Sequence, residues 1–121
     1  MITGSAVVGN RTYGAAAGNA KSTMDIADSV VEKTQPQHVL DDIGYGITAQ
    51  LAAVITVTSS AVLGNVTAGV ATFNKGSKVT LSKVLVAGTL PQPVDSTLGM
   101  GVSVNTQSNL ELVDTTLSDN F

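Results

Sequence analysis

Residues 47–58 read ITAQLAAVITVT, and this stretch decides the expected fold. Its odd positions from Ile47 to Val57 are all apolar, while Thr48, Gln50 and Thr56 occupy even positions. Alternation with a period of two and enrichment in β-branched residues indicate a strand. An uncharged, proline-free strand aggregates when it is exposed. We therefore predict that residues 51–57 are central in a sheet or covered by another chain.

The chain that follows this stretch also indicates β-structure. Turn signals at Gly64-Asn65 and 74–77, and a proline loop at 89–95, separate four further expected strands, at 66–73, 78–86, 98–104 and 110–117. No exact internal repeat and no heptad pattern is evident. Short strands between such turns are typical of an antiparallel β-sandwich or barrel.

The N-terminal third differs in character. Residues 1–20 are rich in glycine and poor in large apolar residues, which predicts a flexible, extended N-terminal arm. Residues 22–33, STMDIADSVVEK, predict a short amphipathic helix, with Ser22 as its cap and Asp25 near its N-terminus. The expected fold is mainly β: a small antiparallel sandwich or barrel at 21–121 with one short α-helix, preceded by the arm.

Composition excludes several functions. The 121 residues carry a formal net charge of −3 and contain no cysteine. The six basic residues are scattered, so we expect no nucleic-acid partner, because phosphate binding needs clustered Lys and Arg. The absence of cysteine excludes disulfide scaffolds and thiol catalysis. No apolar run approaches the roughly 20 residues of a membrane-spanning helix, and no basic and apolar leader opens the chain, so we expect no membrane partner and synthesis in a cytoplasm.

No catalytic or cofactor motif emerges. The acidic pair at 41–42, together with Asp25, Asp28 and Glu32, is the one candidate cation cluster, but it lacks the calcium-loop pattern. His38 is the only histidine, and the pairs Gly44/Gly46 and Gly99/Gly101 do not continue into a phosphate-binding motif. We expect no enzyme, no cofactor and no metal; a pocket that joined Asp41, Asp42 and His38 would be the best support for an enzyme.

Contacts with partners are expected on the arm, the proline loop and a lysine-bearing hairpin. Lys75, Lys78 and Lys83 either blunt a sheet edge or contact an acidic partner. The predicted interface residues are Val7, Val8, Tyr13, Val39, Leu40, Lys75, Lys78, Leu90, Pro91 and Val94.

In composition and layout the chain resembles the small accessory structural proteins of tailed bacteriophage virions, capsid decoration or cement proteins above all. The resemblance lies in the glycine-rich arm, the short helix and segments such as ITAQLAAVITVTSSAVLG and NVTAGVATFNKGSKVTL. It implies a non-enzymatic virion protein that stabilises an assembled capsid, with the major capsid protein or other virion subunits as partners and a homo-trimer as the favoured oligomer. The alternatives are another virion part, such as a fibre, neck or tail subunit, and a secreted β-sandwich binding module; for carbohydrate, the module is disfavoured by the few aromatic residues.

Overall fold

The computed structural model describes residues 1–39 and 42–121, and within these residues every regular element is a strand. The strands are β1 (Ile2–Thr3), β2 (Ala6–Val8), β3 (Thr12–Gly18), β4 (Thr23–Ala27), β5 (Val30–Glu32), β6 (Gly44–Gln50), β7 (Val54–Thr58), β8 (Ala61–Leu63), β9 (Ala68–Thr72), β10 (Lys78–Ser82), β11 (Leu85–Ala87), β12 (Met100–Val104), β13 (Asn109–Val113) and β14 (Thr116–Ser118).

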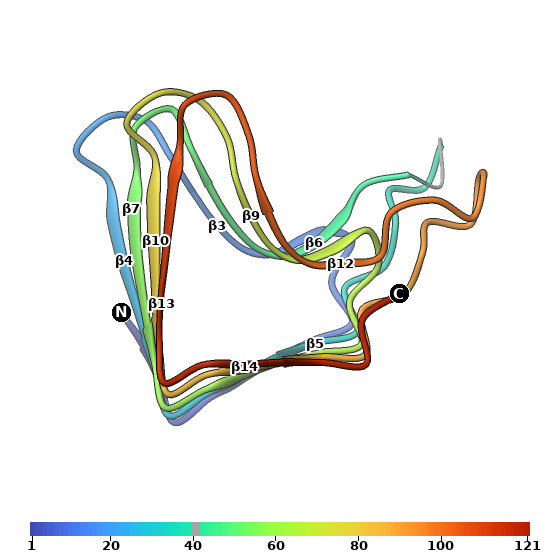
Figure 1. Ribbon diagram of the computed structural model, residues 1–121, viewed down its shortest axis with the longest axis horizontal. Coiled ribbons are helices and arrows are strands. Elements are labelled where there is room, and N and C mark those ends of the chain that lie inside the picture. Colours follow the sequence, from blue (N-terminus) through green and yellow to red (C-terminus); the bar gives the residue numbers. More distant parts are fainter. Residues whose placement is uncertain (40–41) are drawn as a thin grey trace.

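The strands wind into a stack of coils, a parallel β-solenoid. Sheet A contains β1-β4-β7-β10-β13, sheet B contains β2-β5-β8-β11-β14, and sheet C contains β3-β6-β9-β12. Every pairing is parallel. The view along the stack in Figure 1 shows sheet A, sheet B and sheet C enclosing one interior. The predicted antiparallel sandwich is therefore wrong.

Successive coils alternate between a short and a long form. Ile2 pairs with Ile26, 24 residues on, and Ile26 pairs with Val57, 31 residues on. Val57 then pairs with Leu81 and Leu81 with Leu112, which repeats the same two steps. The long coils have longer connections between sheets B and C, which project at the right of Figure 1.

Two coils thus form one unit of 55 residues, and the amino-acid sequence repeats with that period. SAVVGN at 5–10 corresponds to SAVLGN at 60–65, and TQPQHV at 34–39 corresponds to TLPQPV at 89–94. The repeat is degenerate, in keeping with the expected absence of an exact internal repeat.

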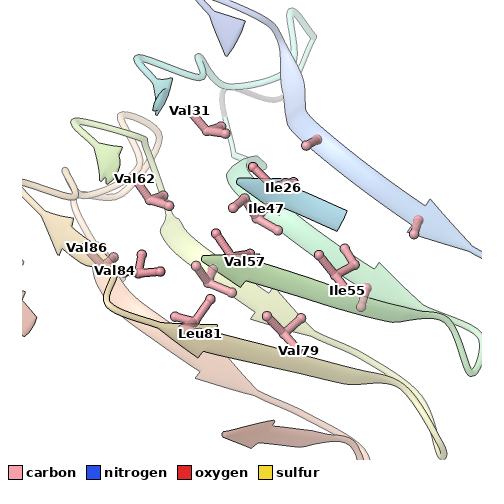
Figure 2. Close-up of a cluster of buried hydrophobic side chains, with 14 of the residues drawn as sticks. Ile26, Val31, Ile47, Ile55, Val57, Val62, Val79, Leu81, Val84 and Val86 are labelled. Atoms are coloured by element: carbon pink, nitrogen blue, oxygen red, sulfur yellow. The ribbon is translucent and has the colours of Figure 1, made fainter. Parts of the chain in front are cut away.

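The interior is filled by stacked aliphatic side chains, one layer for each coil. In sheet A, Ile26, Val57 and Leu81 are fully buried and in register, and in sheet B so are Val62 and Val86. Figure 2 shows these side chains pointing into the same core. Burial of each such side chain contributes about 1.5–3 kcal/mol, so the stack is the main source of stability.

The corners between sheets are ladders of left-handed residues. At the corner between sheets B and C, Gly9, Lys33, Gly64, Gly88 and Asp119 all have φ between 51° and 67°. The corner between sheets A and B has the same conformation in each coil, at Gly4, Asp28, Ser59, Lys83 and Asp114. Backbone hydrogen bonds continue through both corners, so the ladder between coils is not interrupted where the chain turns.

An asparagine links coils at the corner between sheets B and C. Asn65 is fully buried; its Oδ1 accepts from Thr34 N at 3.0 Å and its Nδ2 donates to Val31 O at 3.3 Å. Asn120 binds Thr89 N and Val86 O in the same way, 55 residues later. These amides satisfy the N–H groups of Thr34 and Thr89, which follow the corner of the preceding long coil and lie outside its strands.

The predicted helix at 22–33 is wrong, because this segment forms β4 and β5 around a corner at Asp28 and Ser29. Met24 and Ile26 alternate inward in β4, and Val31 points inward after the turn. A period of two interrupted by a corner imitates the apolar spacing of a helix. Ser22, the expected cap, instead donates from its hydroxyl to Gly18 O.

The predicted N-terminal arm is also wrong. Residues 1–20 contain β1, β2 and β3, which form the first coil by pairing with β4, β5 and β6. Some small residues of this segment therefore belong to the hydrophobic core, since Ala15 and Ala17 are buried in the interior.

The expected strands lie mostly where strands exist, but corners divide them. The stretch 47–57 is split at Leu51 and Ala52, both left-handed, and 78–86 is split at Lys83. β7 is the middle strand of sheet A, which confirms the expected central place of 54–57, whereas Leu51 lies exposed on a corner.

We expect Asn65→Ala to lower the free energy of unfolding by about 1–3 kcal/mol, because it leaves Thr34 N without its hydrogen-bond acceptor in the interior. Asn10→Ala is the matched control: Asn10 holds the same corner position in the first coil but is exposed, so its loss changes stability little. Urea unfolding of both variants measures the difference, and equal effects would contradict the role assigned to Asn65.

We expect Lys33→Gly to raise the free energy of unfolding by about 0.5–1 kcal/mol, because Lys33 adopts φ 56° where three other coils carry glycine. The reciprocal change, Gly64→Ala, places a Cβ at an ordinary contact distance of 4.0 Å from Lys33 Cγ, but at φ 57°, and should destabilise by about 1 kcal/mol. Thermal unfolding of both variants measures whether each change raises or lowers the melting temperature. A higher melting temperature for Gly64→Ala would contradict the claim that a residue with a Cβ is strained at this corner.

Candidate functional site

A ladder of glycines bends sheet C. Gly14, Gly46, Gly69 and Gly101 occupy one position in four successive coils. A Cβ on Gly46 would lie 2.5 Å from Gly69 O, and one on Gly69 would lie 2.7 Å from Gly101 O. Only glycine permits this approach of one coil to the next. Figure 1 shows the resulting curve of the strands, whose concave side faces away from the core.

Three aromatic rings from three coils converge on this concave side. The Tyr13 and Tyr45 rings are neighbours on adjacent strands, with centroids 6.1 Å apart. The Phe73 ring follows the end of β9, beyond the bend, and lies 5.4 Å from the Tyr45 ring. In each of these two pairs, the angle between the ring planes is about 40°, within the range of favourable aromatic pairs. Both tyrosines of the chain and one of its two phenylalanines thus share one site.

These rings line a groove of about 310 Å³, which we call the aromatic groove. Its lining residues are Tyr13, Ile43, Tyr45, Gln50, Phe73 and Asn74. Thr48 and Ala71, on the outward-facing positions of sheet C between its walls, are fully buried. The Oγ1 atom of Thr48 makes no hydrogen bond with any residue that the structure describes.

The environment of the groove raises the pKa of Tyr45. Burial is the largest cause, and the negative charges that Tyr13 and Asp42 would carry oppose ionisation further. The Asp42 carboxylate accepts a hydrogen bond from Ile43 N at 2.6 Å, which fixes it beside the groove. The Tyr45 phenol is therefore neutral over a wide pH range and presents a hydroxyl as both donor and acceptor.

A second feature is the outer face of sheet B, which is unusually apolar. Because Val7, Val31, Val62 and Val86 face the core or pack on it, the alternate residues of the same strands point outward. In register along the stack, the outward residues are Ala6–Val30–Ala61–Leu85–Thr116 and Val8–Glu32–Leu63–Ala87–Ser118. Val8 and Leu85 are 49% and 39% exposed. We call this surface the apolar face.

The apolar face is hollowed along one row. A depression of about 570 Å³ runs from the corner between sheets A and B onto Val30, Ala61 and Leu85. Ala61 lies between the two larger side chains, and its short side chain leaves the hollow. By contrast, the outer face of sheet A carries mainly polar residues, including Asp25, Thr56, Thr80 and Glu111 in one row.

The predicted interface residues are dispersed over the molecule. Val8 lies on the apolar face and Tyr13 in the aromatic groove. Val7, in contrast, packs against the core, so its side chain does not project to a partner. Leu90, Pro91 and Val94 lie on the connection before β12, where Leu90 and Val94 are exposed, and Val39 is 90% exposed before β6. Leu40 lies outside the described residues.

The expected lysine cluster is spread along β10. Lys75 lies in the turn before β10, Lys78 is its first residue and Lys83 follows its end. Lys78 Nζ contacts Glu111 Oε2 at 3.0 Å, an exposed pair that contributes little to stability.

The acidic candidates do not assemble in the part of the chain that is described. Among residues 1–39 and 42–121, no group of three or more His, Cys, Asp and Glu side chains is placed to hold a metal ion. Asp41 falls outside these residues, and His38 is exposed on the connection before β6.

Sequence reasoning missed the aromatic groove apart from Tyr13. Tyr45 and Gln50 lie at opposite ends of β6, Phe73 follows β9 in the next coil, and the three share no local motif. The 55-residue repeat was the signal that could have found them, because it fixes which strands are stacked. In the second 55-residue unit, the residues equivalent to Tyr13 and Tyr45 are Ala68 and Met100.

We expect the pKa of Tyr45 to lie above 10, the ordinary value for tyrosine, because burial opposes its ionisation. The raised pKa means that the neutral phenol stabilises the fold fully below pH 10, and that this contribution is lost as the pH rises through the folded pKa. Ultraviolet absorbance should show a late phenolic transition that Tyr45→Phe removes. Wild-type protein should also lose more unfolding free energy than this variant above pH 10; equal losses would contradict the shift.

None of the described residues forms a helix that is long and apolar enough to cross a membrane. Comparison with known proteins finds no matching family model, no matching curated protein and no matching solved structure.

Proposed function

We propose that this protein is a non-enzymatic structural subunit that assembles side by side through the apolar face of sheet B. The observation that carries the proposal is the contrast between two outer faces of one solenoid. Sheet A exposes Asp, Glu, Thr and Lys, whereas the outward rows of sheet B consist of Val, Leu and Ala apart from Glu32, Thr116 and Ser118. Monomeric proteins rarely expose a large contiguous apolar patch, and such patches mark interaction sites.

A second copy of the chain is the occupant that the surface favours. The apolar face is formed by parallel strands of regular spacing, so side chains of two copies can interdigitate as sheets do when they pack. The hollow over Ala61 can receive a projecting side chain such as Leu85 of a partner. We propose a homo-oligomer, with a trimer favoured; a trimer requires that each copy present two different parts of this face to its two neighbours.

The biological setting that we propose is a bacteriophage virion, with the major capsid protein or other virion subunits as partners. The support is the compositional resemblance to accessory virion proteins together with the apolar face, which offers a contact to a neighbouring subunit. Capsid decoration is the first role that we propose. A fibre, neck or tail subunit is the alternative, since a lateral contact through the apolar face would serve it equally.

We expect the full chain to form a homo-oligomer that Leu85→Lys dissociates. A lysine there places a charge in the buried contact and removes the burial of a leucine, which should raise the dissociation constant at least about tenfold. Analytical ultracentrifugation over a concentration series measures this.

Thr56→Lys is the matched control, since it adds the same charge to the outer face of sheet A and should leave the oligomer intact. Circular dichroism shows whether both variants keep the β-fold. A wild-type protein that stays monomeric at every concentration would overturn the proposal, as would equal dissociation by Thr56→Lys.

A further inference from the structure

The aromatic groove contains most of the aromatic side chains of this protein. Aromatic residues make up 3% of the chain, yet three of the four rings meet at one surface site. They are not needed to form sheet C, because the second 55-residue unit builds the same strands with Ala68 and Met100 in place of Tyr13 and Tyr45. In the first coil, Gly18 stands where Phe73 stands in the third.

Between the rings, the groove offers neutral hydrogen-bonding groups. The Asn74 Oδ1 atom accepts from Leu51 N at 3.3 Å, which positions this amide and leaves its NH₂ group to donate. The side-chain amide of Gln50 and the two tyrosine hydroxyls form no hydrogen bond to any described residue. They are therefore available to a ligand as donors and acceptors.

The lining carries no charged side chain among the described residues. Apolar ring faces combined with uncharged donors and acceptors match a pyranose, which has an apolar face of C–H groups and an edge of hydroxyls. The positive C–H groups of such a face are attracted to the negative face of an aromatic ring. The volume of about 310 Å³ is at the lower end for small-molecule sites, which suits one or two sugar rings.

Thr48 is fully buried on the outward side of sheet C, and its Oγ1 atom lacks a partner within residues 1–39 and 42–121. An unpaired buried hydroxyl costs free energy unless a ligand or a water satisfies it. The Oγ1 atoms of Thr34 and Thr89 are buried without a partner in the same way, and Thr48 does not line the groove, so this hydroxyl is a feature of the interior and not part of the site.

We propose that the aromatic groove is a binding site for a neutral saccharide, with the Tyr13, Tyr45 and Phe73 rings contacting the sugar faces and Gln50 and Asn74 contacting its hydroxyls. The site lies on sheet C, away from the apolar face of sheet B, so the proposal does not depend on assembly. It assigns to this chain a recognition role in addition to its structural one.

The test is an NMR titration of the ¹⁵N-labelled full chain with neutral sugars. The probes are methyl β-glucoside, methyl β-galactoside, N-acetylglucosamine and their β-linked trisaccharides. We expect at least one probe to cause saturable shifts confined to the residues of the groove, including the side-chain amides of Gln50 and Asn74. Tyr45→Met should weaken that probe's binding by about tenfold, the effect of losing one aromatic contact.

Two substitutions keep the test independent of folding. Tyr45→Met and Tyr13→Ala install residues that the second 55-residue unit already carries at equivalent positions, so both variants should fold. Met100→Ala is the matched control outside the groove lining and should leave binding unchanged.

Three results would overturn the proposal. One is the absence of saturable shifts with every neutral sugar, and another is shifts located outside the groove. The third is a groove that ignores sugars but binds an aromatic or proline-rich peptide, which would assign the site to a protein partner.

Discussion

Hydrogen bonding between parallel strands of successive coils is the constraint on which the rest of this structure depends. Each coil satisfies its backbone only through the coil above and below, so register must be kept at every step. A slip by one residue would turn Ile26 and Val57 outward and bring Asp25 and Thr56 into the core. Length variation is therefore confined to places outside the ladders. The chain uses one such place, the connection between sheets B and C, and lengthens it in alternate coils.

The same constraint explains which features were visible in the sequence. β-Structure was predictable from alternation in segments such as 47–58, because inward positions need aliphatic side chains. Corners were not, because the left-handed residues there, Asp28, Ser59 and Lys83, share no residue type and have no glycine or proline beside them. The corner at Asp28 also made a strand-turn-strand segment resemble a helix. The hydrogen bonds of the ladder fix the backbone conformation of each corner. Many residue types are therefore accepted there, and the sequence around a corner carries little sign of the turn.

The candidate site was hidden for a different reason. Tyr13, Tyr45 and Phe73 are far apart along the chain, and their low number argued against a recognition surface built on aromatic residues. Their proximity follows from register and from the bend at the glycine ladder, both of which are properties of the stack. A glycine in each coil, read without the repeat, indicates only a turn or a weak strand. Aligned by coil, the four glycines identify a concave surface.

The two 55-residue units separate what the fold needs from what the surface adds. Gly14 and Gly69, Val7 and Val62, and Thr34 and Thr89 are identical pairs at inward or corner positions. The outward positions of sheet C differ: Tyr13 against Ala68, Tyr45 against Met100, and Gly18 against Phe73. Both units form the same strands, so the outward aromatic side chains are not a requirement of folding. A solenoid of this kind holds its shape with inward and corner residues and leaves its outer faces free to differ. The stability of the coil explains neither the aromatic groove on sheet C nor the apolar face on sheet B. Both surfaces are therefore better explained by the binding partners that we propose for them.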